Sequence, residues 1–337
     1  MTGLADVAEI AGVSTMTVSN VLAGRPGKVS ETTAKRVWAA VEQIGYVPNG
    51  AARALSGHRS RLIAIVINVR SVDALRSTHD ARFIGAITAE LQEHGYCVLL
   101  HASTDLAATI RSLKTWSVDA ACFVKTRARE VDSLRAASDI PMLFPDNYSS
   151  SPDVLTVRID DYEGGRLAGD YLVSKGHRRV CFIGVKAQRK VGLMAERLHG
   201  FRDTFASAGL PRPTIAHNVS TARIDSGIAA AEQVLALRPL PTAAFCSSDE
   251  LAAGLMHGLR RHGLAVPRDI SVVGFDGFEI SEVTTPPLTT IAQDVSAKAH
   301  RCAQLLLNAL GDESGEITSG VLPVRLIERN TVRDLTC

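Results

Sequence analysis

The chain has 337 residues, of which 46% are hydrophobic and 21% charged, and its formal net charge at pH 7 is only +2. This length exceeds a single typical core, so we expect two or three folding units. No apolar run approaches the roughly 18 residues of a membrane span, and no basic-plus-apolar export signal opens the chain, so the sequence predicts a cytoplasmic protein.

The first 22 residues predict two short helices joined through a glycine. Gly3 can cap the first helix, with Asp6 at a position where a carboxylate favours the helix start. Gly12 can end that helix in a left-handed conformation, and Ser14 can cap the next one. The apolar positions that face inward are Leu4, Val7, Ala8, Ala11, Val18, Val21 and Leu22. This is the pattern of a helix-turn-helix, and the alternative is a helical hairpin in any core.

The outer face of the second helix is small and polar. Asn20 can pair with adenine through two hydrogen bonds, and Met16 can contact a thymine methyl group. If the helix lies in the major groove of DNA, the candidate contacts are Ser14, Thr15, Met16, Thr17, Ser19 and Asn20. Residues 1–60 contain six Lys and Arg against four Asp and Glu. This excess of positive charge is small, but it lies beside the helix-turn-helix and so supports contact with DNA phosphates.

A third helix is expected to open at Ser30 and to end at Gly45, with a buried stripe. Its stripe consists of Ala34, Val37, Val41 and Ile44. Trp38 is expected to close the small core. After Pro48, Asn49 can cap a helix of about two turns that ends at Gly57, which is too short to persist alone in water. The alternative is an alanine-rich linker.

From Arg61 onward, short apolar strands alternate with amphipathic helices, which predicts parallel α/β sheets. The predicted strands are 62–67, 96–101, 120–124, 141–144, 154–159, the strand in GHRRVCFIG, 243–247, 271–275 and 321–329. The predicted helices are 83–94, 106–116, 164–175, 197–208, 229–237, 250–262 and 293–310.

No catalytic motif stands out in the chain. There is no GxSxG elbow, HExxH or Walker loop, and the glycines at Gly164, Gly165 and Gly184 do not complete a GxGxxG pattern. The six cysteines are dispersed without a CxxC pair, which favours reduced thiols over disulfides or zinc. We therefore predict no enzyme, no cofactor and no metal site.

Three segments carry a family resemblance: DVAEIAGVSTMTVSNVLAG, VSETTAKRVWAAVEQIGYVPN and AARALSG. The chain resembles the LacI/GalR family of transcriptional repressors. The resemblance implies an N-terminal all-α helix-turn-helix domain plus an α/β core like the periplasmic binding proteins, made of two parallel-sheet lobes. The implied boundaries are 1–48 for the DNA-binding domain, 49–60 for a hinge helix and linker, and 61–337 for the core. The core divides into an N-lobe (61–158 and about 291–318) and a C-lobe (159–290 and about 319–337).

The resemblance also implies how the hinge and the assembly work. A hinge helix would order on operator DNA, with Asn49 and Arg53 as further DNA contacts and Leu55 as a wedge in the minor groove. A homodimer is expected, because the leucine-heptad helix of the tetrameric family members is absent. The segments MTVS, LKTWSVDA and GFDGFEISEVTTPPLTT are most similar to the gluconate-repressor branch.

Ligands of open α/β lobes bind beyond the carboxyl ends of the strands. Residues at or near those ends, or on the adjoining loop, are Asn68, Ser71, Lys125, Asp160, Arg189, Lys190, Ser248 and Asp249. The resemblance adds Arg197, from an R-L-x-G-F pattern, and Asp276, which follows V-V-G-F, and makes Ser248-Asp249 the pocket pair. A buried Arg–carboxylate fork suits hydroxyl or carboxylate ligands. Helix caps and salt bridges between lobes are the alternative roles.

Ala222 stands where sugar- and purine-binding members of the family usually place an aromatic ring. Cations cluster on loops expected to line or rim the cleft, although solvated surface charge is an equal alternative: Lys125, Arg127, Lys186, Arg189 and Lys190. These features favour a sugar acid or sugar phosphate over a neutral sugar. The negative charge that Asp276 would add to the pocket disfavours an anionic ligand.

The sequence thus predicts a sequence-specific repressor of a carbohydrate or sugar-acid operon that binds double-stranded operator DNA at the nucleoid. A small effector in the cleft would control its operator affinity. The alternatives are a solute-binding protein and a sugar-acid enzyme built on the same core.

Overall fold

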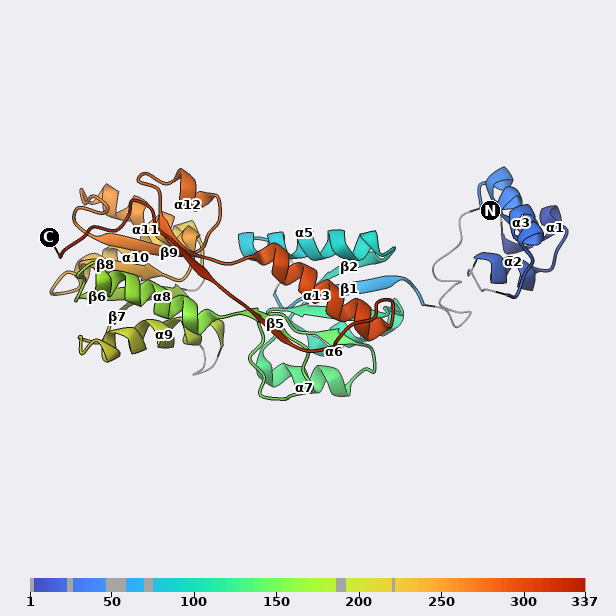
Figure 1. Ribbon diagram of the computed structural model, residues 1–337, viewed down its shortest axis with the longest axis horizontal. Coiled ribbons are helices and arrows are strands. Elements are labelled where there is room, and N and C mark those ends of the chain that lie inside the picture. Colours follow the sequence, from blue (N-terminus) through green and yellow to red (C-terminus); the bar gives the residue numbers. More distant parts are fainter. Residues whose placement is uncertain are drawn as a thin grey trace. The chain divides into compact units, whose positions relative to one another are not determined.

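The computed structural model describes residues 3–22, 27–46, 59–69, 75–185, 192–219 and 222–336 (Figure 1). The chain separates into two compact units, Met1–Leu62 and Ile63–Cys337. The first unit is helical, and the second consists of sheets covered by helices.

The first unit contains α1 (Leu4–Ala11), α2 (Thr15–Leu22) and α3 (Glu31–Ile44). The Gly3 N–H donates to Asp6 Oδ2 at 2.7 Å, and the Thr17 N–H donates to Ser14 Oγ at 3.2 Å. Gly12 ends α1 with a φ of 61°. These contacts confirm the predicted helix starts and the glycine turn between α1 and α2.

The core of this unit is the predicted apolar stripe. Val7, Val18 and Val37 are fully buried at the centre of the three helices. The prediction that Trp38 closes this core is wrong, because 51% of its surface is exposed. One residue step turns a helix by about 100°, so Trp38 points away from the stripe that contains Val37.

The second unit has two lobes. The four-stranded lobe has the strand order β2-β1-β3-β4, and helix α13 packs against α5 (Figure 1). Its strands are β1 (Leu62–Ile67), β2 (Cys97–Ala102), β3 (Ala120–Val124) and β4 (Met142–Leu143). Its helices are α5 (Thr78–Glu93), α6 (Leu106–Thr115), α7 (Ala128–Ala136) and α13 (Val295–Leu310).

The six-stranded lobe has the order β12-β10-β9-β8-β6-β7, and all neighbours are parallel except β10 and β12. Its strands are β6 (Val180–Val185), β7 (Thr214–Val219), β8 (Ala243–Cys246), β9 (Ser271–Asp276), β10 (Thr289–Ala292) and β12 (Arg325–Ile327). Its helices are α8 (Asp161–Ser174), α9 (Leu193–Ser207), α10 (Ile224–Ala236), α11 (Asp249–Arg261) and α12 (Ile280–Val283).

Alternating side chains of this sheet pack on opposite faces. Phe182 and Phe245 lie in the cluster formed with α8 and α9, whereas Cys181 and Cys246 lie in the cluster formed with α10 and α11. Residues of one strand point alternately to the two faces. The sheet is therefore covered by helices on both faces, as the continuous apolar strands predict.

The chain passes between the lobes at three places. β5 (Val157–Ile159) leads into α8, the end of β10 leads into α13, and β11 (Gly320–Leu322) leads into β12. β5 and β11 pair with each other in parallel. The single strand predicted over 321–329 is instead two strands, separated at Pro323, which has no N–H to donate to a ladder.

Candidate ligand cavity and DNA-facing helix

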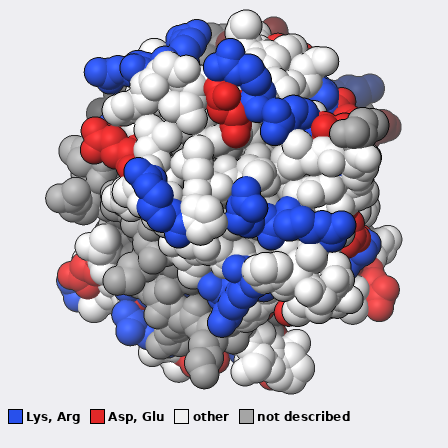
Figure 2. Space-filling model, turned by 90° about the vertical axis from the view of Figure 1, so that its left-hand side faces the viewer, with Lys and Arg blue, Asp and Glu red and all other residues white. Residues whose placement is uncertain are grey.

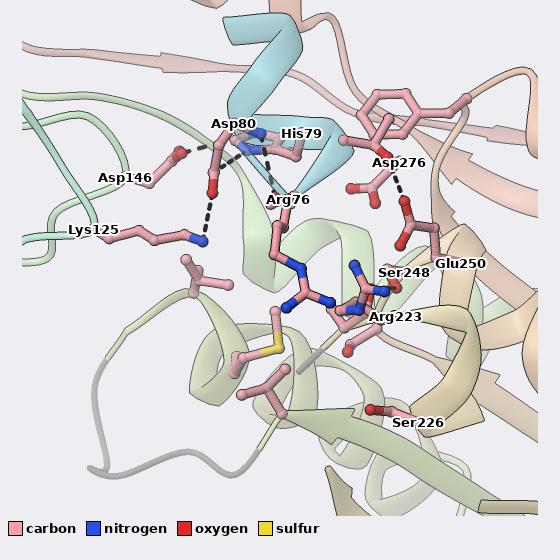
Figure 3. Close-up of a pocket in the computed structure, with 18 of the residues that line it drawn as sticks. Arg76, His79, Asp80, Lys125, Asp146, Arg223, Ser226, Ser248, Glu250 and Asp276 are labelled. Atoms are coloured by element: carbon pink, nitrogen blue, oxygen red, sulfur yellow. Dashed lines mark hydrogen bonds and ion pairs between the residues drawn. The ribbon is translucent and has the colours of Figure 1, made fainter. Parts of the chain in front are cut away.

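A cavity of about 930 Å³ lies between the two lobes. The start of α5 and the residues after β3 and β4 line it from one lobe, and the ends of β8 and β9 with the starts of α9, α10 and α11 line it from the other. Figure 3 shows charged side chains converging on it from both sides. This is the position that parallel strands predict, beyond their carboxyl ends.

Four of the predicted effector residues line this cavity: Lys125, Arg197, Ser248 and Asp276. Ser71, Arg189 and Lys190 lie outside the described residues. The other three predicted residues make hydrogen bonds outside the cavity.

Asn68, Asp160 and Asp249 do not line the cavity. Asn68 Nδ2 donates to Glu130 at 2.8 Å, and Asp160 caps α8 by accepting the Glu163 N–H at 2.9 Å. Asp249 accepts from the Phe278 N–H at 2.8 Å and from the Thr290 hydroxyl at 2.5 Å. Each side chain thus has a structural role, which is the alternative weighed for this group.

Arg197 is held rigidly at the cavity wall. Its Nε donates to Asp161 Oδ1 and its Nη1 to the Ser247 carbonyl, both at 2.7 Å, and its guanidinium carbon lies 3.5 Å from the centroid of the Phe275 ring. Among the described residues, Nη2 has no protein partner. Burial raises the pKa of Asp161, although the charge of Arg197 opposes that rise. The arrangement presents a pre-oriented donor to a ligand.

Two glycines allow this placement of Arg197. A Cβ on Gly165 of α8 would lie 2.0 Å from the Arg197 carbonyl oxygen, and a Cβ on Gly200 of α9 would lie 1.9 Å from the Tyr162 carbonyl oxygen. Only glycine permits so close an approach of two helix backbones. Gly165 therefore serves helix packing and not the dinucleotide binding that a glycine pair could suggest.

Lys298 is the centre of a buried polar cluster in the other wall. Its side chain is almost fully buried, and its Nζ lies 2.8 Å from Asp146 Oδ2 and 2.9 Å from His79 Nε2. Because Lys298 donates to Nε2, the proton of a neutral His79 ring lies on Nδ1, which is 3.2 Å from Asp80 Oδ1.

Asp80 continues this cluster to the mouth of the cavity, where it pairs with Lys125. Burial raises the pKa of Asp80, but the hydrogen bond from His79 and the charge of Lys125 outweigh it and lower the pKa to about 2. Asp80 is therefore ionised at neutral pH and neutralises Lys125.

Asp276 lies at the end of β9 and accepts from Gln293 Nε2 at 2.7 Å. Burial raises its pKa although the charge of Arg197 opposes this, and burial together with the charge of Asp276 raises the pKa of Asp249. Lys125, Asp146 and Asp276 have φ angles of 60°, 54° and 117°. Left-handed backbone at non-glycine residues costs free energy and is concentrated at functional sites.

Several cavity residues were absent from the sequence predictions: Arg76, His79, Asp80, Asp161, Arg223 and Lys298. Two signals could have located part of this set. Ser77, with Asp80 three residues later, resembles a capping box and marks the true start of α5. Lys298 stands on the apolar stripe of α13, where a charge needs a buried partner.

Stacking surfaces are scarce in this cavity. Within the described part of the chain, Phe278 is the one Phe, Tyr or Trp side chain that lines it, and the Arg82 guanidinium already lies 4.5 Å from the centroid of that ring. Ala222 also lines the cavity, as predicted, without an aromatic ring. The described residues contain no group of three or more His, Cys, Asp or Glu able to hold a metal ion.

The outer face of α2 is accessible. Met16 is 67% exposed, Ser14 and Thr15 are exposed, and Thr17, Ser19 and Asn20 are partly exposed. The predicted contacts Asn49, Arg53 and Leu55 lie outside the described residues. A short polar helix presented by a buried three-helix core has the form of a major-groove reader.

Comparison with known proteins gives matches over the full chain. Residues 3–49 match the model of bacterial regulatory proteins of the lacI family, and residues 170–332 match the periplasmic binding protein-like domain. The HTH-type transcriptional repressor PurR of Vibrio cholerae serotype O1 (strain M66-2) is 32% identical, over 100% of this chain and 99% of its own length. The same repressor of Escherichia coli O139:H28 is 31% identical, over 99% of this chain and 98% of its own.

Solved structures agree with these matches. The lac repressor dimer bound to operator and the anti-inducer ONPF is 27% identical with a TM-score of 0.85, and covers 98% of this chain and 99% of its own. The complex of the transcriptional regulator CelR with cellobiose is also 27% identical, with a TM-score of 0.72, and covers 98% of this chain and 100% of its own. None of the described helices has the length and apolar character to cross a membrane.

Proposed function

Because the chain belongs to the LacI family of transcriptional repressors, we propose that an acidic small molecule in the cavity between its lobes controls its affinity for operator DNA. The family membership makes the chain a DNA-binding transcriptional repressor with an effector-binding domain, and not an enzyme. The regulated genes would serve sugar-acid use, and the protein would act as a homodimer at the nucleoid in the cytoplasm.

The exposed face of α2 supports the DNA side of this proposal. Thr15, Met16 and Asn20 would read base edges in the major groove, with Ser14, Thr17 and Ser19 beside them. From the family, Asn49 and Arg53 would add contacts in the hinge segment, and Leu55 would be a minor-groove wedge.

The proposal of an acidic effector is based on the arginines that line the cavity. Arg197 offers Nη2, and Figure 3 shows the Arg76 and Arg223 side chains directed into the same space. A guanidinium binds a carboxylate or a phosphate through two parallel hydrogen bonds. Ser248, together with Asp276 in its wall, would bind the hydroxyl groups of a sugar acid.

The acidic residues of the wall do not argue against an anion. Asp80, Asp146 and Asp161 are each paired with a cation, namely Lys125, Lys298 and Arg197. Arg223 Nε lies 3.6 Å from Asp225, and Glu250 accepts a hydrogen bond from Thr78. Asp276 has a raised pKa, which lessens the repulsion that its charge would exert on an anion. The carboxylates thus neutralise cations of the wall and orient Arg197, whose Nη2 is left for the ligand.

The PurR relatives suggest a purine as the alternative effector. A planar base is usually recognised by stacking on an aromatic ring, with hydrogen bonds at its edges. The scarcity of aromatic side chains among the described residues of this cavity favours the sugar acid. A sugar acid also agrees with the sequence motifs, which are most similar to the gluconate-repressor branch of the family.

Calorimetry on the full-length protein tests the effector class. The ligands are gluconate, 2-ketogluconate, their 6-phosphates, the matched neutral sugars and a set of purine bases. We expect binding of at least one acid, with a shift in operator affinity, and no heat from neutral sugars. A ligand at 100 times its Kd should also raise the free energy of unfolding by about 2.7 kcal/mol. Binding confined to a neutral sugar or a purine would contradict the acidic effector and leave the repressor assignment intact.

A further inference from the structure

A strongly basic edge lies on the six-stranded lobe, at the amino ends of its strands. Five segments form it: 174–179, 208–213, 236–242, 260–270 and 333–336. Together they contain nine Lys and Arg but only two Asp and Glu. In contrast, residues 159–290 and 319–337 as a whole contain 18 basic and 16 acidic residues. Positive charge is therefore segregated to this one edge, which we call the basic edge.

The parallel topology brings these segments together. Four of them lead into the neighbouring strands β9, β8, β6 and β7, which run in the same direction. The Thr242 N–H donates to the Arg179 carbonyl at 2.8 Å, and the Leu335 N–H donates to the Lys175 carbonyl at 2.9 Å. Strands lie about 4.8 Å apart, so arginines on four successive loops span about 15 Å. Figure 2 shows Lys and Arg spread across this face, with a row through its middle.

Most of these cations are not neutralised by the protein. Among the described residues, only Lys175 and Arg268 of the basic edge pair with a carboxylate. The remaining seven cations of the basic edge have no such pair in the described chain: Arg178, Arg179, Arg212, Arg238, Arg260, Arg261 and Arg333. Arg202, beside this edge, has a buried Nε without a hydrogen-bond partner in the described chain, and burial and the charge of Arg212 lower its pKa.

Helix electrostatics explain a part of this charge. Arg260 and Arg261 lie in the last turn of α11, where cations stabilise the negative end of a helix. Arg238, just beyond α10, donates from Nη1 to the Leu235 and Leu237 carbonyls and so meets the negative end of that helix in the same way. The loop arginines Arg178 and Arg212 lie beyond the last turns of α8 and α9 and pair with no carboxylate in the described chain. Their repulsion favours an external anion.

We propose that the basic edge binds the phosphate backbone of a second DNA duplex without sequence preference, so that a repressor on its operator bridges two DNA segments. A row of cations fits an extended polyanion better than a compact one. Eight of the nine cations are arginines, whose planar forks match phosphate oxygens. Neutralising phosphates releases bound counterions, which supplies affinity without base contacts. An acidic protein segment is the competing occupant.

In the test, the full-length protein is first bound to immobilised operator DNA, so that its helix-turn-helix surfaces are occupied. A duplex without operator sequence is then added as the probe. We expect binding at low salt, with a steep salt dependence. If the row contacts about four phosphates, the affinity should fall about 100-fold between 50 and 200 mM salt.

The variant R178A/R179A/R212A, which removes three cations without a carboxylate partner in the described chain, should weaken capture of the second duplex at least tenfold and reduce the salt slope by about 3, one for each cation removed. The matched control R111A/K114A/R129A removes three cations from α6 and α7 that have no carboxylate partner in the described chain. It should leave capture unchanged. Both variants should keep operator affinity within about twofold, which separates this test from the repressor function.

Three results would overturn the proposal. The first is no capture of the second duplex by operator-bound protein, and the second is equal loss in the edge variant and the control. The third is capture of a poly-glutamate peptide as tightly as DNA, which would assign the basic edge to acidic proteins.

Discussion

Replacing Arg197 by leucine should destabilise the core strongly, because the substitution leaves the Asp161 carboxylate buried without its cationic partner, although the Tyr148 hydroxyl still donates to Asp161 Oδ2 at 2.7 Å. The Arg197 and Asp161 side chains are only 7% and 1% exposed. Breaking such a buried pair costs about 3–5 kcal/mol, more than the contact itself contributes, since Asp161 keeps its desolvation penalty. The lost stacking of the guanidinium on Phe275 is included in this total and is not added to it.

The cost should depend on pH in a defined direction. Burial already raises the pKa of Asp161, and removing Arg197 raises it further. A carboxyl whose pKa is higher in the folded state binds a proton on folding, so the folded state gains stability as the pH falls. The R197L penalty should therefore be largest near pH 7.5 and smaller near pH 5.

Urea unfolding of the full-length protein at the two pH values measures this effect. The control R166L removes an exposed arginine of α8 that pairs with Glu163 and Asp170, and it should cost at most about 1 kcal/mol. The double variant R197L/D161L should recover part of the loss, because no buried charge remains. If R197L unfolds like R166L, or if its penalty is independent of pH, this account of the pair is wrong.

Three further changes follow from single contacts. G200A should cost about 1–3 kcal/mol in urea unfolding, because the new Cβ would meet the Tyr162 carbonyl, whereas G85A, with open space in α5, should not destabilise. The lowered pKa of Asp80 adds about 2 kcal/mol to the free energy of unfolding above about pH 4, and this contribution is lost as the pH falls to about 2. In D80N, the free energy of unfolding should therefore fall less between about pH 4 and pH 2 than in the wild type. N20A should weaken operator binding by about 1–3 kcal/mol and relax one base preference in a binding-site selection; an unchanged ranking of operators would exclude Asn20 from readout.

Local signals were enough to predict most of the elements. The caps at Gly3, Ser14 and Ser30 and the stops at Gly12 and Gly45 fixed the three N-terminal helices, because each satisfies backbone groups that a helix end leaves open. Long amphipathic helices and apolar strands of the core were equally evident from their periodicity. Several short elements were missed, including α7, α12, β7 and β10.

The cavity was harder to predict because its chemistry depends on pairs distant in sequence. Strand ends identified Lys125 and Ser248, and the family resemblance identified Asp276, but a strand end does not say whether a side chain faces the cavity. Asp160 and Asp161 are neighbours with different roles, since one caps α8 and the other binds Arg197. That distinction depends on the rotation of a helix whose start was predicted three residues late.

Side-chain contacts that join the lobes beside the cavity include the Thr78 hydroxyl donating to Glu250, the Arg82–Glu279 pair, and the Tyr148 hydroxyl donating to Asp161. α5 supplies Thr78 and Arg82, whereas Glu250 and Glu279 belong to the six-stranded lobe. These inter-lobe contacts favour the arrangement of the two lobes in which residues of both cavity walls can contact the same effector. An effector changes the balance of arrangements only through its difference in affinity for them.

Arg82 does not line the cavity, so R82Q changes the closure without removing a ligand contact. The Arg82–Glu279 pair is exposed and contributes at most about 1 kcal/mol, so the apparent effector Kd should rise no more than about fivefold as the competent fraction falls. Calorimetry of R82Q against the α6 control R111Q measures this. T78V, which removes another inter-lobe donor, should act in the same direction. An effector Kd that is unchanged in both R82Q and T78V would show that these contacts do not set the closure.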